Sequence, residues 1–186
     1  MGFLDFFKKK NPEIEKEKKL LNLSIAHLEK GYLVDYDLRT WTVTGVYEYD
    51  WGDNYFSKEY QLQADSLTMY LSVDEDDELE LALMRKIEIR TIDSKLPEHI
   101  IKNDIPPEVL TYSGKTFYMK RDTAGHFRNV DSGKKSWSPF VLWEYHDESG
   151  EFILNIEQWG EKEFEAAYGM YAKQTDFTEI LPGKIL

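Results

Sequence analysis

Cysteine is absent from the 186 residues, proline is scarce with 6 residues, and no long apolar run occurs. Without thiols, the chain has no disulfide, no thiolate metal ligand and no cysteine nucleophile. No apolar run approaches the roughly 20 residues that span a bilayer, and residues 1–10 lack the apolar core and cleavage site of a signal peptide. We therefore expect a cytoplasmic protein.

Basic residues are outnumbered, since Lys and Arg total 23 against 35 Asp and Glu, which gives a formal net charge of -12. A surface of this sign repels a polyanion, so we expect no nucleic-acid partner. The hydrophobic fraction of 41% can supply a real core, and the length suits one domain or two small ones.

Residues 1–30 differ in charge from the remainder, because they hold seven lysines against five acids whereas the body of the chain is strongly acidic. Asn11 followed by Pro12 has the form of an N-cap with proline at the first helical position, so a helix is expected to begin here. Ser24 is expected to cap a further turn that ends near Gly31. These signals predict a basic, helical N-terminal extension.

From Gly31 onward, short segments rich in Val, Tyr, Trp, Thr and Ile alternate with Gly, Asp and Asn, a pattern typical of strands and turns. Three prolines interrupt it in 93–107, which we interpret as a connection between a first β half, 31–92, and a second β half, 108–186. Asp176 is expected to cap a last turn. The expected strands are 32–36, 40–49, 55–62, 68–73, 79–83, 86–92, 109–112, 115–120, 125–129, 139–145, 151–158 and 161–171.

The predicted fold is therefore mainly β, with antiparallel strands in two similar consecutive halves, sandwich- or barrel-like, that together form one cooperative domain. The halves can be aligned, since 41–43 corresponds to 117–119, 58–60 to 143–145, and 70–74 to 153–157. Two interpretations stay open. The alignment reflects a duplicated β unit, or it reflects the similarity that any two antiparallel meanders share by chance.

Short motifs also follow one another in a distinctive order along residues 25–182. They are 27–36 (HLEKGYLVDY), 41–45 (WTVTG), 59–62 (EYQL), 70–74 (YLSVD), 112–118 (YSGKTFY), 143–145 (WEY), 153–157 (ILNIE), 168–169 (YG) and 181–182 (LP). In this order they resemble the bacterial domain-of-unknown-function family 4178. The resemblance implies a fold but no reaction and no catalytic residues. Genes of that family tend to lie beside those for phage-shock-protein-A-like and small membrane proteins, which implies work at the cell envelope.

No catalytic, cofactor or metal site is predicted. Gly114-Lys115-Thr116 is similar to the end of a phosphate-binding loop, but Val109 stands where its first glycine is required, so a hairpin turn at Ser113-Gly114 is expected. The acidic run 74–78 lacks the glycine and the final glutamate of an EF-hand and indicates a solvated hairpin. None of the histidines has metal-ligand spacing, and the last is expected in a surface turn: His27, His99, His126 and His146.

Trp51 and Trp137 stand in polar, turn-like stretches, whereas most other aromatic residues are expected in the core. An aromatic ring beside acidic residues can hold a cationic ligand through cation–π and charge attraction. We therefore take these two residues as candidate ligand contacts, with ordinary loop packing as the alternative.

The first ten residues place four apolar side chains directly before three lysines. On a helix the phenylalanine rings share one face, and the lysines can reach anionic headgroups, which predicts reversible contact with the inner face of a membrane. Docking of this segment on a partner helix or on the protein's own β core is the alternative. The residues concerned are Phe3, Leu4, Phe6, Phe7, Lys8, Lys9 and Lys10.

The sequence thus favours a non-enzymatic binding or adaptor protein that joins a protein partner in an envelope-associated complex at the cytoplasmic face of the membrane. The alternative is a binder of a small cationic ligand, or an enzyme of a type that no motif identifies. A deep pocket with converging acidic and aromatic side chains would favour the alternative, and an exposed apolar strip would favour the adaptor.

Overall fold

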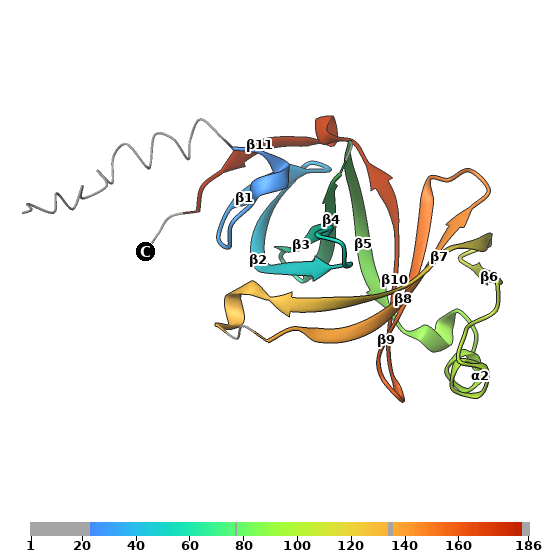
Figure 1. Ribbon diagram of the computed structural model, residues 1–186. Coiled ribbons are helices and arrows are strands. Elements are labelled where there is room, and N and C mark those ends of the chain that lie inside the picture. The colour runs from blue at the N-terminus through green and yellow to red at the C-terminus, as the bar shows by residue number, and fades with distance from the viewer. Residues whose placement is uncertain (1–22, 77, 134–135, 184–186) are drawn as a thin grey trace, which may run out of the picture.

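The computed structural model describes residues 23–76, 78–133 and 136–183. The helix expected from Asn11 onward and the apolar-basic segment 1–10 lie outside these residues. In the described part of the chain, antiparallel strands dominate and join in one 11-stranded sheet, which confirms the predicted mainly β class (Figure 1).

The elements follow one another as two meanders joined by a short helix. The first meander contains η1 (Ile25–His27), β1 (Leu33–Tyr36), β2 (Arg39–Asp50), β3 (Phe56–Ala64), β4 (Leu67–Glu75) and β5 (Leu79–Ile87). The connection contains η2 (Ile89–Thr91) and α2 (Leu96–Asn103). The second contains β6 (Val109–Tyr112), β7 (Lys115–Asn129), η3 (Val130–Ser132), β8 (Ser138–Asp147), β9 (Phe152–Gly160), β10 (Glu163–Ala172), η4 (Gln174–Asp176) and β11 (Phe177–Leu181).

Two sequence-based assignments were wrong, and the expected connection between the halves holds a helix. The segments 79–83 and 86–92 were separated, but β5 runs through Arg85 to Ile87. The connection 93–107 holds α2, because Pro97 lies in the first helical turn, where its missing N–H costs nothing. The turn expected after Asp176 is the strand β11, which pairs with β1 at the other end of the chain, a partner that no local pattern reveals.

The second half also differs from expectation along β7 and β8. The segments 115–120 and 125–129 are one strand, β7, with an irregularity between Met119 and Arg121. His146, expected in a surface turn, lies within β8. The hairpin turn expected at Ser113-Gly114 is confirmed, since both residues have positive φ, at 49° and 74°.

Eight of the strands close into a ring. Their order is β2-β3-β4-β5-β10-β9-β8-β7, and a second pairing of β2, with β7, completes the circuit. The ring has two seams between the meanders. At one seam, β5 pairs with β10 over Leu81–Ile87, and at the other, Tyr47–Asp50 of β2 pair with β7. The ring leaves the first part of β2 free to pair with β1.

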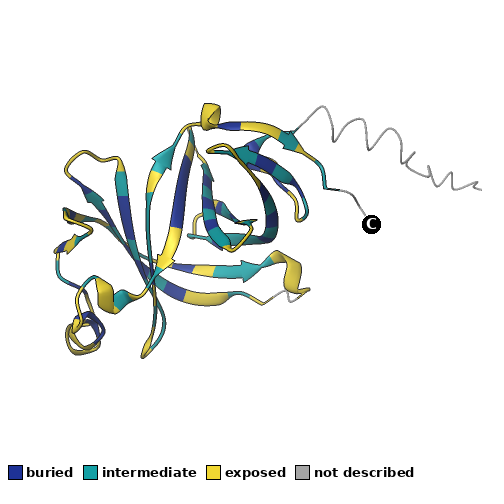
Figure 2. Cartoon of the chain, turned by 180° about the vertical axis from the view of Figure 1, so that it is seen from behind, coloured by how far each residue is buried: buried dark blue, intermediate teal, exposed yellow. Residues whose placement is uncertain are grey.

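Each meander packs one face of its strands under covering segments, away from the interior of the ring. The first outer core lies beneath η1, β1 and β11, and the second lies beneath α2 and β6. Buried and partly exposed residues alternate along the strands (Figure 2). Fully buried members of the first outer core include Trp41, Tyr60 and Leu71, and those of the second include Phe117, Tyr145 and Leu154.

Candidate functional site

The interior of the ring contains two adjoining cavities, lined by residues from all eight strands. The wide chamber has a volume of about 340 Å³ and the narrow chamber about 180 Å³. They share one wall of five residues, namely Tyr49, Glu59, Met84, Asn155 and Glu157. Because side chains alternate along a strand, Glu59 faces this interior while its neighbour Tyr60 lies in the first outer core.

Aromatic rings form much of the wall of the wide chamber. The Phe127 and Trp159 rings meet edge to face at 5.1 Å, and Phe127 also meets the rings of Tyr47 and Tyr49 at 5.5 and 5.4 Å. Trp159 donates a hydrogen bond from Nε1 to Glu157 Oε2 at 3.2 Å, and the Tyr49 hydroxyl donates to a carboxylate of β3. The aromatic rings therefore pack against one another around the chamber, and the hydrogen bonds from Trp159 and Tyr49 orient its carboxylates.

Three glutamates converge on the wide chamber against one lysine. Glu157 on β9 lies directly opposite Glu165 on β10, and Glu59 comes from β3. Lys86 forms an ion pair with Glu165 and lies over the Tyr70 ring, 5.1 Å from its centroid. The one lysine of the wide chamber therefore faces three carboxylates and pairs with Glu165.

Burial raises the pKa of Glu59 to about 7, against the opposing influence of Lys86 and of the Tyr49 hydroxyl. Burial also raises the pKa of Glu157 to about 8, and the negative charges of Glu59 and Glu165 add to the effect. Both carboxylates thus titrate near neutral pH, where a carboxylate in water is fully ionised.

The narrow chamber adds further acidic groups at the opposite end of the interior. Asp74, Glu80 and Glu144 line it, together with Arg121. The Tyr55 hydroxyl donates to Asp74 Oδ2, and burial and this carboxylate raise the pKa of Tyr55 to about 12. Beside the chamber, His146 Nε2 lies 2.9 Å from Glu144 Oε1.

Two buried acceptors of this interior have no hydrogen-bond partner among the described residues: Asp74 Oδ1 and Asn155 Oδ1. A buried polar atom without a partner is costly, so each marks a place where a donor from a ligand is favourable. Asn155 lies on the wall between the chambers, and its amide nitrogen is turned toward Met84 Sδ, at 3.6 Å.

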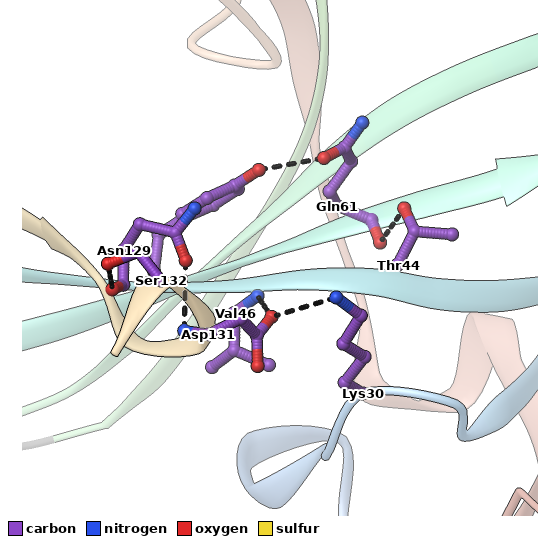
Figure 3. Close-up of polar contacts among 8 residues, drawn as sticks. Lys30, Thr44, Val46, Gln61, Asn129, Asp131 and Ser132 are labelled. Carbon is purple, nitrogen blue, oxygen red and sulfur yellow. Dashed lines mark hydrogen bonds and ion pairs between the residues drawn. The ribbon is translucent and has the colours of Figure 1, made fainter. Parts of the chain in front are cut away.

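A polar contact between the two meanders lies next to residues that line the wide chamber (Figure 3). Asp131 of η3 accepts a hydrogen bond from the Val46 backbone N–H at 3.1 Å and lies 3.9 Å from Lys30 Nζ. Val46 follows the irregularity in β2, where the ladder leaves this N–H available. The contact keeps Tyr47 and Asn129, which line the chamber, at the same edge of the ring.

The sequence-predicted ligand contacts are not brought together. Trp51 lines the narrow chamber, donates to Ser57 Oγ at 2.8 Å and carries the Arg121 guanidinium 4.5 Å from its ring. Trp137 lines a separate hollow of about 280 Å³, where Arg128 lies 4.7 Å from its ring. Each indole therefore already has a cation from its own chain, and a ligand cation would have to displace it.

The acidic residues of the interior were not singled out from the sequence. The local signal was weak, because Glu59 stands between Lys58 and Tyr60 and Glu157 stands between Ile156 and Gln158, so each glutamate has a polar or charged neighbour, as is common in a strand with one exposed face. Asp74 was assigned to a solvated hairpin, yet one of its oxygens is fully buried. The segment from Phe3 to Lys10 lies outside the described residues.

Within the described ranges, no three His, Asp or Glu side chains are grouped so that they could hold a metal ion. None of the helices described is both long enough and apolar enough to cross a bilayer.

Comparisons with known proteins identify the family. The family model "Domain of unknown function (DUF4178)" matches residues 29–174, and the chain belongs to this family, as its motifs indicated. It is 32% identical over 185 residues to an uncharacterized protein of Aquifex aeolicus (strain VF5), which covers 98% of this chain and 99% of that protein. No solved structure matches the chain.

Proposed function

We propose that this member of the DUF4178 family is a binding protein for a small organic cation, held in the two chambers inside the ring of strands. The observation that carries the proposal is the composition of the interior. Six acidic residues line the two chambers against two basic ones, and both basic side chains are engaged, Lys86 with Glu165 and Arg121 over Trp51.

Electrostatics favours a cation over an anion or a neutral ligand in such a cavity. Carboxylates removed from water attract a positive charge more strongly than surface carboxylates do, because the local dielectric is low. The tyrosine and tryptophan rings of the wide chamber offer further stabilisation through their π faces. A chamber of about 340 Å³ accepts a small organic molecule rather than a folded partner.

Titration with tetramethylammonium and with n-butylamine tests the proposal, followed by calorimetry and by the fluorescence of Trp159, which lines the wide chamber. We expect saturable binding of at least one cation. Glu157→Gln should weaken that binding at least tenfold, whereas Glu161→Gln, at an exposed position, should not change it. Absence of saturable binding by either cation would refute the proposal.

Binding should release protons near neutral pH. The pKa values of Glu59 and Glu157 are raised to about 7 and about 8, so a part of each group is protonated before the cation arrives. A positive charge beside them lowers both pKa values, and the lost protons enter the buffer. Calorimetry in buffers of different ionisation enthalpy measures this release.

Two expectations from the sequence remain predictions alongside this proposal. The first is a role as an adaptor in an envelope-associated complex, with membrane contact by residues 1–10. These residues lie outside the described part of the chain, and sedimentation with anionic liposomes tests the contact. Duplication of a β unit is supported by the placement of the aligned segments, since 41–43, 58–60 and 70–74 lie on β2, β3 and β4 and their counterparts on β7, β8 and β9.

A further inference from the structure

The acidic side chains inside the ring lie at two levels along the strands. On β9, Glu157 faces Glu165, and Asn155, two residues earlier, faces Glu144 of β8. Two residues of a strand span about 6.5–7 Å. Glu144 therefore lies one such step from Glu157, toward the narrow chamber.

The first meander repeats this spacing. Glu59 of β3 faces Ser72 of β4, and Asp74, two residues further along β4, faces Glu80 of β5. The upper level thus contains the glutamates of the wide chamber, and the lower level contains the acids of the narrow chamber. The upper level is Glu59, Glu157 and Glu165, and the lower level is Asp74, Glu80 and Glu144.

From this arrangement we infer that the ligand is a linear aliphatic diamine or a longer polyamine, with one ammonium group at each acidic level. The inference rests on the proposed function and specifies its ligand class. In an extended 1,4-diaminobutane the two nitrogens are about 6 Å apart, which matches one two-residue step along a strand.

The wall between the levels suits the methylene chain and its ends. Met84 and the Tyr49 ring belong to both chambers and offer apolar surface where the chain would pass. Asn155 Oδ1 and Asp74 Oδ1, the buried acceptors without a partner in the described chain, lie at the wall and at the lower level, where ammonium groups can donate to them. A quaternary ammonium ion has no N–H and leaves both acceptors unsatisfied.

Calorimetric titration of the full chain with amines of increasing length tests the inference. The series is n-butylamine, 1,3-diaminopropane, 1,4-diaminobutane, 1,5-diaminopentane and 1,8-diaminooctane. We expect 1,4-diaminobutane or 1,5-diaminopentane to bind at least tenfold more tightly than n-butylamine, with weaker binding by the shorter diamine. Equal affinity for n-butylamine and for every diamine would overturn the inference.

Two variants test which ammonium group of the ligand each acidic level binds. Glu144→Gln, at the lower level, should reduce the affinity for 1,4-diaminobutane by a larger factor than the affinity for n-butylamine, so that the two affinities become similar. Glu157→Gln should weaken both, and Glu148→Gln, at an exposed position, should change neither. A Glu144→Gln variant that keeps the full preference for the diamine would contradict the two-level arrangement.

The outcomes separate this inference from the proposed function. Binding of n-butylamine or tetramethylammonium without any preference for diamines leaves a cation-binding protein whose ligand has one charge, and the inference alone fails. Absence of binding by every amine and by tetramethylammonium would refute both the inference and the proposed function. Binding of 1,4-diaminobutane and n-butylamine with unchanged affinities in Glu157→Gln would place their site outside the chambers and would likewise refute both.

Discussion

The two faces of the same strands differ in what they contribute. On β4, Leu71 is fully buried in the first outer core, while Ser72, the next residue, lines the narrow chamber. On β9, Leu154 is fully buried in the second outer core, while Asn155 lies on the wall between the chambers. The outer faces therefore supply most of the apolar burial that stabilises the fold, and the inner faces carry charged side chains beside two smaller apolar clusters.

Both meanders have an apolar outer face and an inner face that lines the chambers, but different segments cover the two outer faces. Tyr60 and Tyr145 occupy aligned positions, and both are fully buried, yet Tyr60 donates to the Ala26 carbonyl within η1 while Tyr145 donates to the Pro107 carbonyl before β6. Strands and a short 3-10 turn cover one core, and a helix with a short strand covers the other. The shared part is the interior, which is what a common binding role would preserve.

The largest expected effect comes from removing an outer-face leucine. Leu71→Ala and Leu154→Ala should each lower the free energy of unfolding by about 2–5 kcal/mol, because each leaves a cavity in a close-packed core. Ser72→Ala, on the inner face, should change stability by less than about 0.5 kcal/mol. Urea denaturation measures all three, and equal losses for the two faces would break the comparison.

A smaller loss is expected at the seam between β5 and β10. A Cβ on Gly169 would lie 2.0 Å from the Leu83 carbonyl oxygen, so Gly169→Ala should force the strands apart and cost about 1–3 kcal/mol. Gly160→Ala is a matched control on the neighbouring strand, since its Cβ would meet only Glu163 atoms at 3.5 Å or more. Similar stability of the two variants would show that this seam tolerates widening.

Much of this architecture could be predicted from the sequence. Alternating apolar and polar residues located most strands, and the turn residues Ser113 and Gly114 located a hairpin. The closure of the ring could not be predicted, because β2 pairs with β7 and β5 with β10 across long stretches of chain, and such pairings depend on packing rather than on local propensity.

The candidate site illustrates the same limit. Strand alternation places Glu59 and Tyr60 on opposite faces of β3, but it does not show that the face of Glu59 is enclosed. Enclosure requires β9 and β10 from the far half of the chain, which bring Glu157 and Glu165 to the same cavity. Conversely, the polar surroundings of Trp51 suggested an available ring, whereas Arg121 from β7 already occupies its face.

Replacing an inner carboxylate should stabilise the protein rather than weaken it. The folded-state pKa of Glu157 is about 8, above its ordinary 4.5, so this group contributes stability below about pH 4.5 that is lost as the pH rises through 8. Glu157→Gln removes the buried charge and should raise the free energy of unfolding by about 1–3 kcal/mol at pH 9, with little gain at pH 4.

Denaturation of both proteins between pH 4 and pH 9 measures this difference. The wild type should lose stability relative to Glu157→Gln as the pH rises, and Glu161→Gln, which is exposed, should follow the wild type throughout. A variant that is less stable than the wild type at pH 9 would mean that the Glu157 carboxylate stabilises the ring. That result would contradict the conclusion that the outer faces, and not the inner faces, stabilise the fold.

The smallest effect concerns the covering segments of the two outer cores. Tyr60→Phe and Tyr145→Phe each remove one hydroxyl donor, from the Ala26 carbonyl at 2.9 Å and from the Pro107 carbonyl at 2.8 Å. Tyr145→Phe should cost about 1 kcal/mol, since the ring still fills its site and one hydrogen bond is lost. Tyr60→Phe should cost about 1–2 kcal/mol, since the Tyr60 hydroxyl also accepts a hydrogen bond from the Leu28 N–H at 3.3 Å. Because the two bonds lie far apart, on different halves, the double variant should lose the sum of the two, and urea denaturation measures whether it does. A clearly larger loss in the double variant would show that the two cores are energetically coupled through the ring, so that the outer faces stabilise the interior jointly rather than half by half.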